Sequence, residues 1–130
     1  MAVTHSTAAR NAATDAVTAL ISTSGKLVFR ISPSTVASPG TAVATLSLSA
    51  TAFGASSSGT ATANAITSDT NATGNASPVA YATLQTSGGT VVIQCSVAAS
   101  GSDINMTNGL TVAAGDTVSC SSLTYTALSA

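Results

Sequence analysis

The chain has 130 residues, which suits a single domain, but only 5% of them are charged and 3% are aromatic. The formal net charge is −1, and Lys and Arg together number three. Nucleic-acid binding requires clustered cations that neutralise phosphates, so we expect no nucleic-acid partner. No stretch approaches the roughly 20 apolar residues of a membrane helix, and the first 20 residues lack a signal-peptide pattern. We therefore expect no membrane partner and synthesis in a cytoplasm.

The sequence predicts a short N-terminal arm over residues 1–5. It predicts one β-rich domain over residues 6–130, which begins with a helix over 6–21. Ser6 is a suitable N-cap for this helix. Apolar residues recur at spacings of three and four and predict one packing stripe, made of Ala9, Ala13, Ala16, Val17, Leu20 and Ile21. The polar residues are expected to face elsewhere: Arg10, Asn11, Thr14, Asp15 and Thr18. We expect the stripe to pack either on the protein's own strands or on a partner. After the helix, Gly25 is expected to adopt a left-handed conformation.

Alternating apolar and polar residues predict the first strands. The pattern in 26–32 places Leu27, Phe29 and Ile31 on one side, and residues 42–50 form a second strand after a loop over 33–40. Residues 60–67 predict a weaker strand. The loop over 68–77 has the composition of an exposed segment, which is either disordered or ordered by a neighbour in an assembly.

The C-terminal half has the densest strand patterning. Strands over 79–85 and 90–97 are joined by Ser87-Gly88-Gly89 as a hairpin, and Val91, Ile93, Cys95 and Val97 share its buried face. A short strand starts at Ile104, and Asn108-Gly109 predicts a type I′ turn into 110–112. The last strand is expected over 117–128 with a β-bulge at Ser121-Ser122. About eight short strands predict a mainly β domain of β-sandwich or jelly-roll type with one N-terminal helix.

The residues that carry chemistry are few and scattered. His5 is the only histidine and has no second ligand near it, so we expect no metal site. The four aspartates are not clustered, and no glutamate is present. Cys95 and Cys120 form either a disulfide across the sandwich or, as cytoplasmic synthesis favours, two buried free thiols. These observations predict a protein that is not an enzyme and that has no catalytic residue and no cofactor.

Three groups of segments carry a family resemblance. They are Thr4–Asn11 with Asp15–Val17; Val43–Leu46, Ala52–Gly54 and Ala65–Thr70; and Gly115–Ser119 with Leu123–Thr126. Together they make the chain similar to small virion-associated structural proteins of tailed bacteriophages. The resemblance implies a capsid decoration (cement) protein that binds the outer surface of the assembled capsid.

That resemblance implies two partners, the major capsid protein and further copies of the chain itself as a dimer or trimer. We expect the contacts to come from the arm, the adjacent helix and the loop over 68–77: Ala2, Val3, Thr4, His5, Ser6, Thr7, Arg10, Asp69, Asn71 and Asn75. The alternatives are a tail or neck structural subunit, or a tail module that binds a receptor or carbohydrate.

Overall fold

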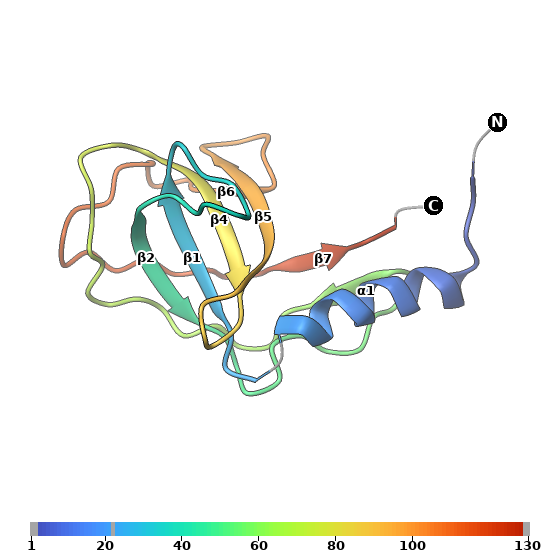
Figure 1. The fold of residues 1–130 in the computed structure, drawn as a ribbon. Helices are drawn as coiled ribbons and strands as arrows, with labels where there is room; N and C mark the ends of the chain where they lie inside the picture. The colour runs from blue at the N-terminus through green and yellow to red at the C-terminus, as the bar shows by residue number, and fades with distance from the viewer. Residues whose placement is uncertain (1–2, 22, 129–130) are drawn as a thin grey trace.

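A computed structural model describes residues 3–21 and 23–128 and has mainly β structure with one N-terminal helix (Figure 1). Five strands form the main sheet, in the order β2-β1-β4-β5-β6, and two form a separate ladder, β3-β7. The elements are α1 (Thr7–Ile21), β1 (Lys26–Ile31), β2 (Ala42–Ser47), β3 (Thr60–Thr62), β4 (Val79–Gln85), β5 (Val91–Ala98), β6 (Ile104–Asn105) and β7 (Thr124–Thr126).

The main sheet is antiparallel except at its last pair, where β6 runs parallel to β5. The predicted β4–β5 hairpin is confirmed, and its register places Leu84 opposite Ile93 and Ala82 opposite Cys95. Because paired residues lie on the same side of a sheet, this register places Ile93 and Cys95 on the face that carries the buried Ala82 and Leu84.

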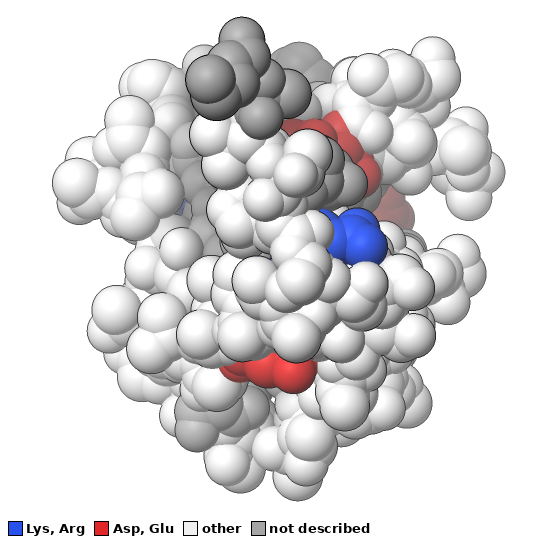
Figure 2. All heavy atoms as spheres, turned by 90° about the vertical axis from the view of Figure 1, so that its right-hand side faces the viewer, with Lys and Arg blue, Asp and Glu red and all other residues white. Residues whose placement is uncertain are grey.

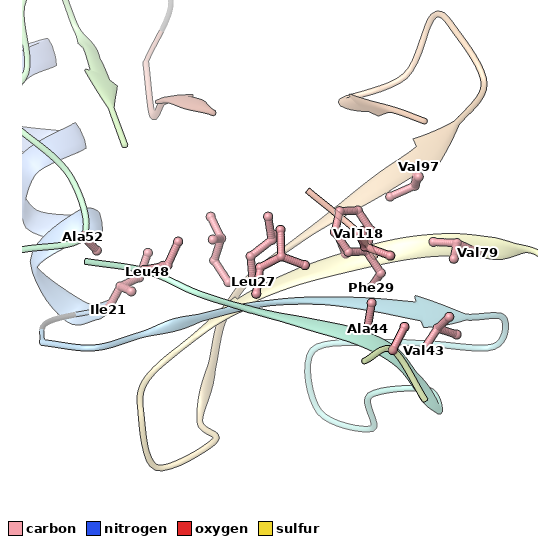
Figure 3. Packing of buried hydrophobic residues seen from close by; sticks show 14 of the residues in the cluster. Ile21, Leu27, Phe29, Val43, Ala44, Leu48, Ala52, Val79, Val97 and Val118 are labelled. Carbon is pink, nitrogen blue, oxygen red and sulfur yellow. The ribbon is translucent and has the colours of Figure 1, made fainter. Parts of the chain in front are cut away.

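One face of the main sheet builds the core. Leu27, Phe29 and Leu46 are almost completely buried, as the alternation in the first two strands predicts. Figure 3 shows the side chains of Ile21, at the end of α1, and Leu48 at one end of this cluster, and those of Val79 and Val97 at the other. The apolar core therefore lies between the sheet and the segments that cover it, and within the described residues Ile21 is the only member of the cluster that comes from the helix.

The layer opposite the sheet is made of irregular segments rather than regular strands. Asp69 and Val118 exchange backbone hydrogen bonds of 2.9 and 2.8 Å, and Asn75 N donates to Val112 O at 2.9 Å. The same layer covers the outer edge of β2, where Gly74 N donates to Val43 O at 3.0 Å. The β-rich domain with an N-terminal helix is thus confirmed, whereas the strand pairing does not confirm a jelly roll or a sandwich of two regular sheets.

The loop over 68–77 is ordered by this chain itself. Ala72 is buried in the core, and the Asp69 carboxylate accepts hydrogen bonds of 2.9 Å from Thr45 N and Asn71 N. The expectation of a disordered or neighbour-ordered loop was wrong. Its polar composition reflects the need to satisfy backbone groups at a sheet edge, since Asp and Asn side chains do so locally.

Two expectations for the C-terminal segments were also wrong. In the described part of the chain, the final ladder is limited to Thr124–Thr126, and residues 119–122 lie outside any ladder, so no bulge forms at Ser121-Ser122. Serines at 119, 121 and 122 leave no continuous apolar face to hold a strand against the core. Asn108 lacks the positive φ that a type I′ turn requires, and 110–112 form no strand.

The helix has its predicted extent, but half of the predicted packing stripe is exposed and only Ile21 of it is fully buried. Its buried side chains are Thr14, Thr18 and Ile21, whereas Leu20 is 62% exposed. Alanine buries little apolar area, so an alanine stripe gains little from packing, and hydrogen bonds decide which face docks. The turn after the helix also differs: Ser24 has the positive φ (56°), and a Cβ at Gly25 would overlap the Ile21 side chain.

Candidate functional site

The lateral lobe, which we define as α1, loop 54–59, β3 and β7, extends from one side of the main sheet (Figure 1). Its central contact is the buried Thr14 hydroxyl, which donates to Gly59 O at 2.6 Å and accepts from Ala127 N at 3.1 Å. One side chain therefore joins the helix, the loop and the C-terminal segment.

The neighbouring polar side chains of α1 bind the same loop. Asn11 Oδ1 accepts from Gly59 N at 2.8 Å, and Asp15 Oδ1 accepts from Ser56 N at 2.9 Å. Arg10 Nη1 donates to Ser58 O at 3.3 Å, and its Nε is buried with no hydrogen-bond partner. Asn11, Thr14, Asp15 and Thr18 recur at helical spacing, and this polar period is the sequence signal that would have identified the docking face.

The N-terminal arm leads away from this lobe. Val3, Thr4, His5, Ser6 and Thr7 are all exposed, and Ala2 lies outside the described residues. Ser6 is the N-cap, as predicted: its Oγ accepts from Ala9 N at 3.1 Å. The arm is therefore accessible over the whole range that the structure describes.

The predicted contact residues do not form one surface. Arg10 is turned toward loop 54–59. Asp69 Oδ2 accepts from Thr45 N in β2, and Asn75 Oδ1 accepts from Ser77 N, both at 2.9 Å. Asn71 is exposed. Figure 1 places α1 and the loop over 68–77 at opposite ends of the molecule. A partner that bound both would have to span the main sheet.

A groove of about 580 Å³ lies between residues 103–109 and 116–124. Asp103, Asn105, Asn108 and Asp116 are among its lining residues, and buried Phe29 contributes to it. Asp103 Oδ2 already accepts from Ser96 N and Asp116 Oδ2 from Ala113 N, at 3.1 and 2.9 Å. The lining is rich in hydroxyl and amide groups, which suits a polar, uncharged ligand better than an apolar one.

The two cysteines are free thiols, and both are half-buried. Cys95 Sγ lies 3.6 Å from Ala82 O, and Cys120 Sγ lies 3.3 Å from Ser122 O. Desolvation, reinforced by the negative charge of Asp103, raises the pKa of the Cys95 thiol to about 11, and burial also raises the pKa of Cys120. Raised thiol pKa values oppose a nucleophilic role, because the thiolate is the reactive form.

We expect Cys95 to resist alkylation in the folded protein. At pH 8 a thiol with a pKa near 11 has on the order of 100-fold less thiolate than an unperturbed cysteine, so iodoacetamide should label it about that much more slowly. Mass spectrometry of labelled peptides measures the rate, and the same protein in urea provides the control. Equal folded and unfolded rates at Cys95 would contradict this protection.

The side chains that could bind a metal ion are scattered over the described part of the chain. Among residues 3–21 and 23–128, no group of three His, Cys, Asp or Glu side chains lies close enough to hold a metal ion. Figure 2, which views the side of the molecule with the chain ends, shows only separate small charged patches on a largely uncharged surface. No helix in the part of the chain that the structure describes is long and apolar enough to cross a bilayer.

Comparisons with known proteins return no relative: the chain matches no protein-family model, no curated protein and no solved structure.

Proposed function

We propose that the protein is a structural component of a bacteriophage virion and decorates the outer surface of the capsid by bridging major capsid subunits. The observation that carries this proposal is the exposed segment Val3–Thr7, held away from the main sheet by a helix that is docked on loop 54–59 through Asn11, Thr14 and Asp15. An accessible segment on a rigid support suits capture by a large neighbouring surface.

Two further features support an assembly role. The described residues hold no group of three His, Cys, Asp or Glu side chains that could bind a metal ion, and charge is sparse over the surface in Figure 2. A net charge near zero does little to keep a free protein apart from its neighbours, which a permanently assembled protein tolerates. We also propose that the main sheet and the irregular layer opposite it together form a sandwich-like domain.

Deleting residues 2–7 is expected to reduce occupancy of the protein on purified virions by at least about tenfold, because that segment supplies the proposed capsid contact. Quantitative mass spectrometry against the major capsid protein measures occupancy. Since that deletion also removes the Ser6 cap, a deletion of residues 2–5 that keeps the cap is the matched variant and should also lose occupancy. Full occupancy without the arm would refute its role.

The same measurement separates decoration from a tail or neck position. Copy numbers comparable to that of the major capsid protein support decoration, whereas a few to a dozen copies support a neck or tail subunit. Assembly by mass action on a capsid also predicts that the bound form unfolds at a higher temperature than the free protein.

Carbohydrate binding is a second candidate, and the groove between 103–109 and 116–124 favours it. Aspartate and asparagine side chains line that groove and suit sugar hydroxyls, but Phe29 is only 2% exposed and offers no stacking surface. Glycan-array binding that Asn108→Ala abolishes would support this function over decoration.

A further inference from the structure

The turn over residues 107–109 is an exposed part of the groove wall. All three of its residues are exposed, and all three line the groove of about 580 Å³. Hydrogen bonds hold the chain on both sides of this turn: Met106 N donates to Ala98 O at 2.8 Å, and Val79 N donates to Leu110 O at 2.9 Å. The turn is therefore a short exposed segment between two fixed points.

Within this turn, Asn108 and Gly109 hold two groups that react with each other when they are free to meet. The Gly109 nitrogen can attack Asn108 Cγ, because the two atoms close a five-membered ring along the chain. Gly109 has a φ of +104°, and no other part of the chain lies within 4 Å of the position that a Cβ would take. Among residues 3–21 and 23–128, no hydrogen bond holds the Gly109 N–H or the Asn108 side chain. Neither neighbouring atoms nor hydrogen bonds oppose the attack.

We propose that Asn108 is a self-modification site, which converts to aspartate and isoaspartate without an enzyme. The bond from Cγ to the Gly109 nitrogen forms as the Cγ–Nδ2 bond breaks, and the proton lost from the Gly109 N–H leaves with Nδ2 as ammonia. Water then opens the resulting succinimide. Opening at Cγ gives aspartate, whereas opening at the backbone carbonyl of Asn108 gives isoaspartate, in which the main chain runs through Cβ and Cγ. The balance is one water consumed and one ammonia released, with no oxidant and no cofactor.

The other five asparagines of the chain lack this combination of features, and none of them precedes a glycine. Asn71 is exposed, but the following N–H, that of the buried Ala72, donates to Asp116 O at 3.0 Å. Side-chain hydrogen bonds hold the remaining four: Asn11, Asn64, Asn75 and Asn105. The fold therefore protects these asparagines and leaves Asn108 unprotected.

The reaction changes the groove. Asp103 and Asp116 are the only acidic side chains in the described lining, so conversion of Asn108 adds a third carboxylate. One added negative charge takes the formal net charge of the chain from −1 to −2. Isoaspartate also lengthens the main chain between the fixed Met106 and Leu110, so the turn must change shape. An aged chain thus presents a more acidic and differently shaped groove than a new one.

Peptide mapping by mass spectrometry measures the conversion in the purified full chain, and the result does not depend on the proposed virion role. At about 37 °C and mildly alkaline pH, Asn108 should convert at least about tenfold faster than Asn71, because a Cβ on the following residue hinders the attack. Isoaspartate should be among the products, since direct hydrolysis of the side-chain amide gives aspartate alone. Equal rates at Asn108 and Asn71, or a product without isoaspartate, would overturn the inference.

Unfolding separates the effect of the fold from that of the local sequence. The folded chain already leaves Asn108 free, so its rate in urea should stay within about threefold of its folded rate, whereas Asn71 should convert faster once its neighbour is released. A folded rate at Asn108 that is lower than the urea rate by more than about threefold would show that the turn is protected, and would overturn the inference.

Gly109→Ala tests the cyclic mechanism with Asn108 unchanged. The added Cβ should slow conversion at Asn108 by at least about tenfold, and urea unfolding checks that the variant folds despite the positive φ at this position. If the Gly109→Ala chain converted as fast as the native chain, even in urea, attack by the backbone nitrogen would be excluded.

Discussion

Thr14→Val is expected to lower the free energy of unfolding by about 2–4 kcal/mol, although valine has almost the same shape as threonine. The Thr14 hydroxyl is fully buried and serves both Gly59 O and Ala127 N. Removing it leaves the buried Gly59 carbonyl and the partly buried Ala127 N–H unsatisfied, and each such loss costs about 1–3 kcal/mol. Urea unfolding monitored by circular dichroism measures the loss.

Two variants isolate the hydroxyl as the cause. Thr14→Ser keeps the donor and acceptor and should cost about 1 kcal/mol for the lost methyl group. Thr7→Val makes the same change at an exposed position of the helix and should cost less than about 0.5 kcal/mol. If Thr14→Val were as stable as Thr7→Val, hydrogen bonding would not be what docks the helix.

Gly74→Ala is expected to have the second large effect, about 3 kcal/mol or more. Gly74 has a φ of +73°, and an added Cβ would overlap the backbone of Ala113 and Ala114. The substitution therefore adds a backbone clash to the usual cost of about 1–2 kcal/mol for a side chain in the left-handed region. Urea unfolding again measures the change.

Gly101→Ala is the natural control, because Gly101 has a nearly equal φ of +70° and open space where the Cβ would lie. The difference between the two variants measures the close approach alone. Because Gly74 N bonds Val43 O at the outer edge of β2, Gly74→Ala should also uncover that edge and promote aggregation. Equal losses of stability in Gly74→Ala and Gly101→Ala would mean that the backbone of Ala113 and Ala114 moves aside for the added Cβ without cost.

The sheet could be predicted where side-chain burial alone decides the structure. Leu27 and Phe29 in β1 and the β4–β5 hairpin follow from alternation, because a strand with one buried face must repeat every two residues. The irregular second layer has no such period. Asp69, Ala72 and Asn75 are held by backbone hydrogen bonds and local caps, which leave little trace in the order of apolar residues.

The site was predictable only in part. The extent of α1 and the Ser6 cap follow from local chemistry, and the accessible arm was expected. The orientation of the helix could not be predicted from its apolar positions, because the polar residues that recur from Asn11 to Thr18 determine which side docks. When the apolar positions are mostly alanine, a few well-aligned hydrogen bonds outweigh the small area that they would bury.

The polar docking of α1 has a thermal consequence. Exposure of apolar surface raises heat capacity and exposure of polar surface lowers it. Detaching the helix between Arg10 and Thr18 exposes mainly polar groups, so its heat-capacity change should be close to zero, whereas unfolding of the core has a large positive one. The free energy of releasing the helix should therefore vary almost linearly with temperature. Its attachment should keep strengthening on cooling, while the apolar core passes through a stability maximum.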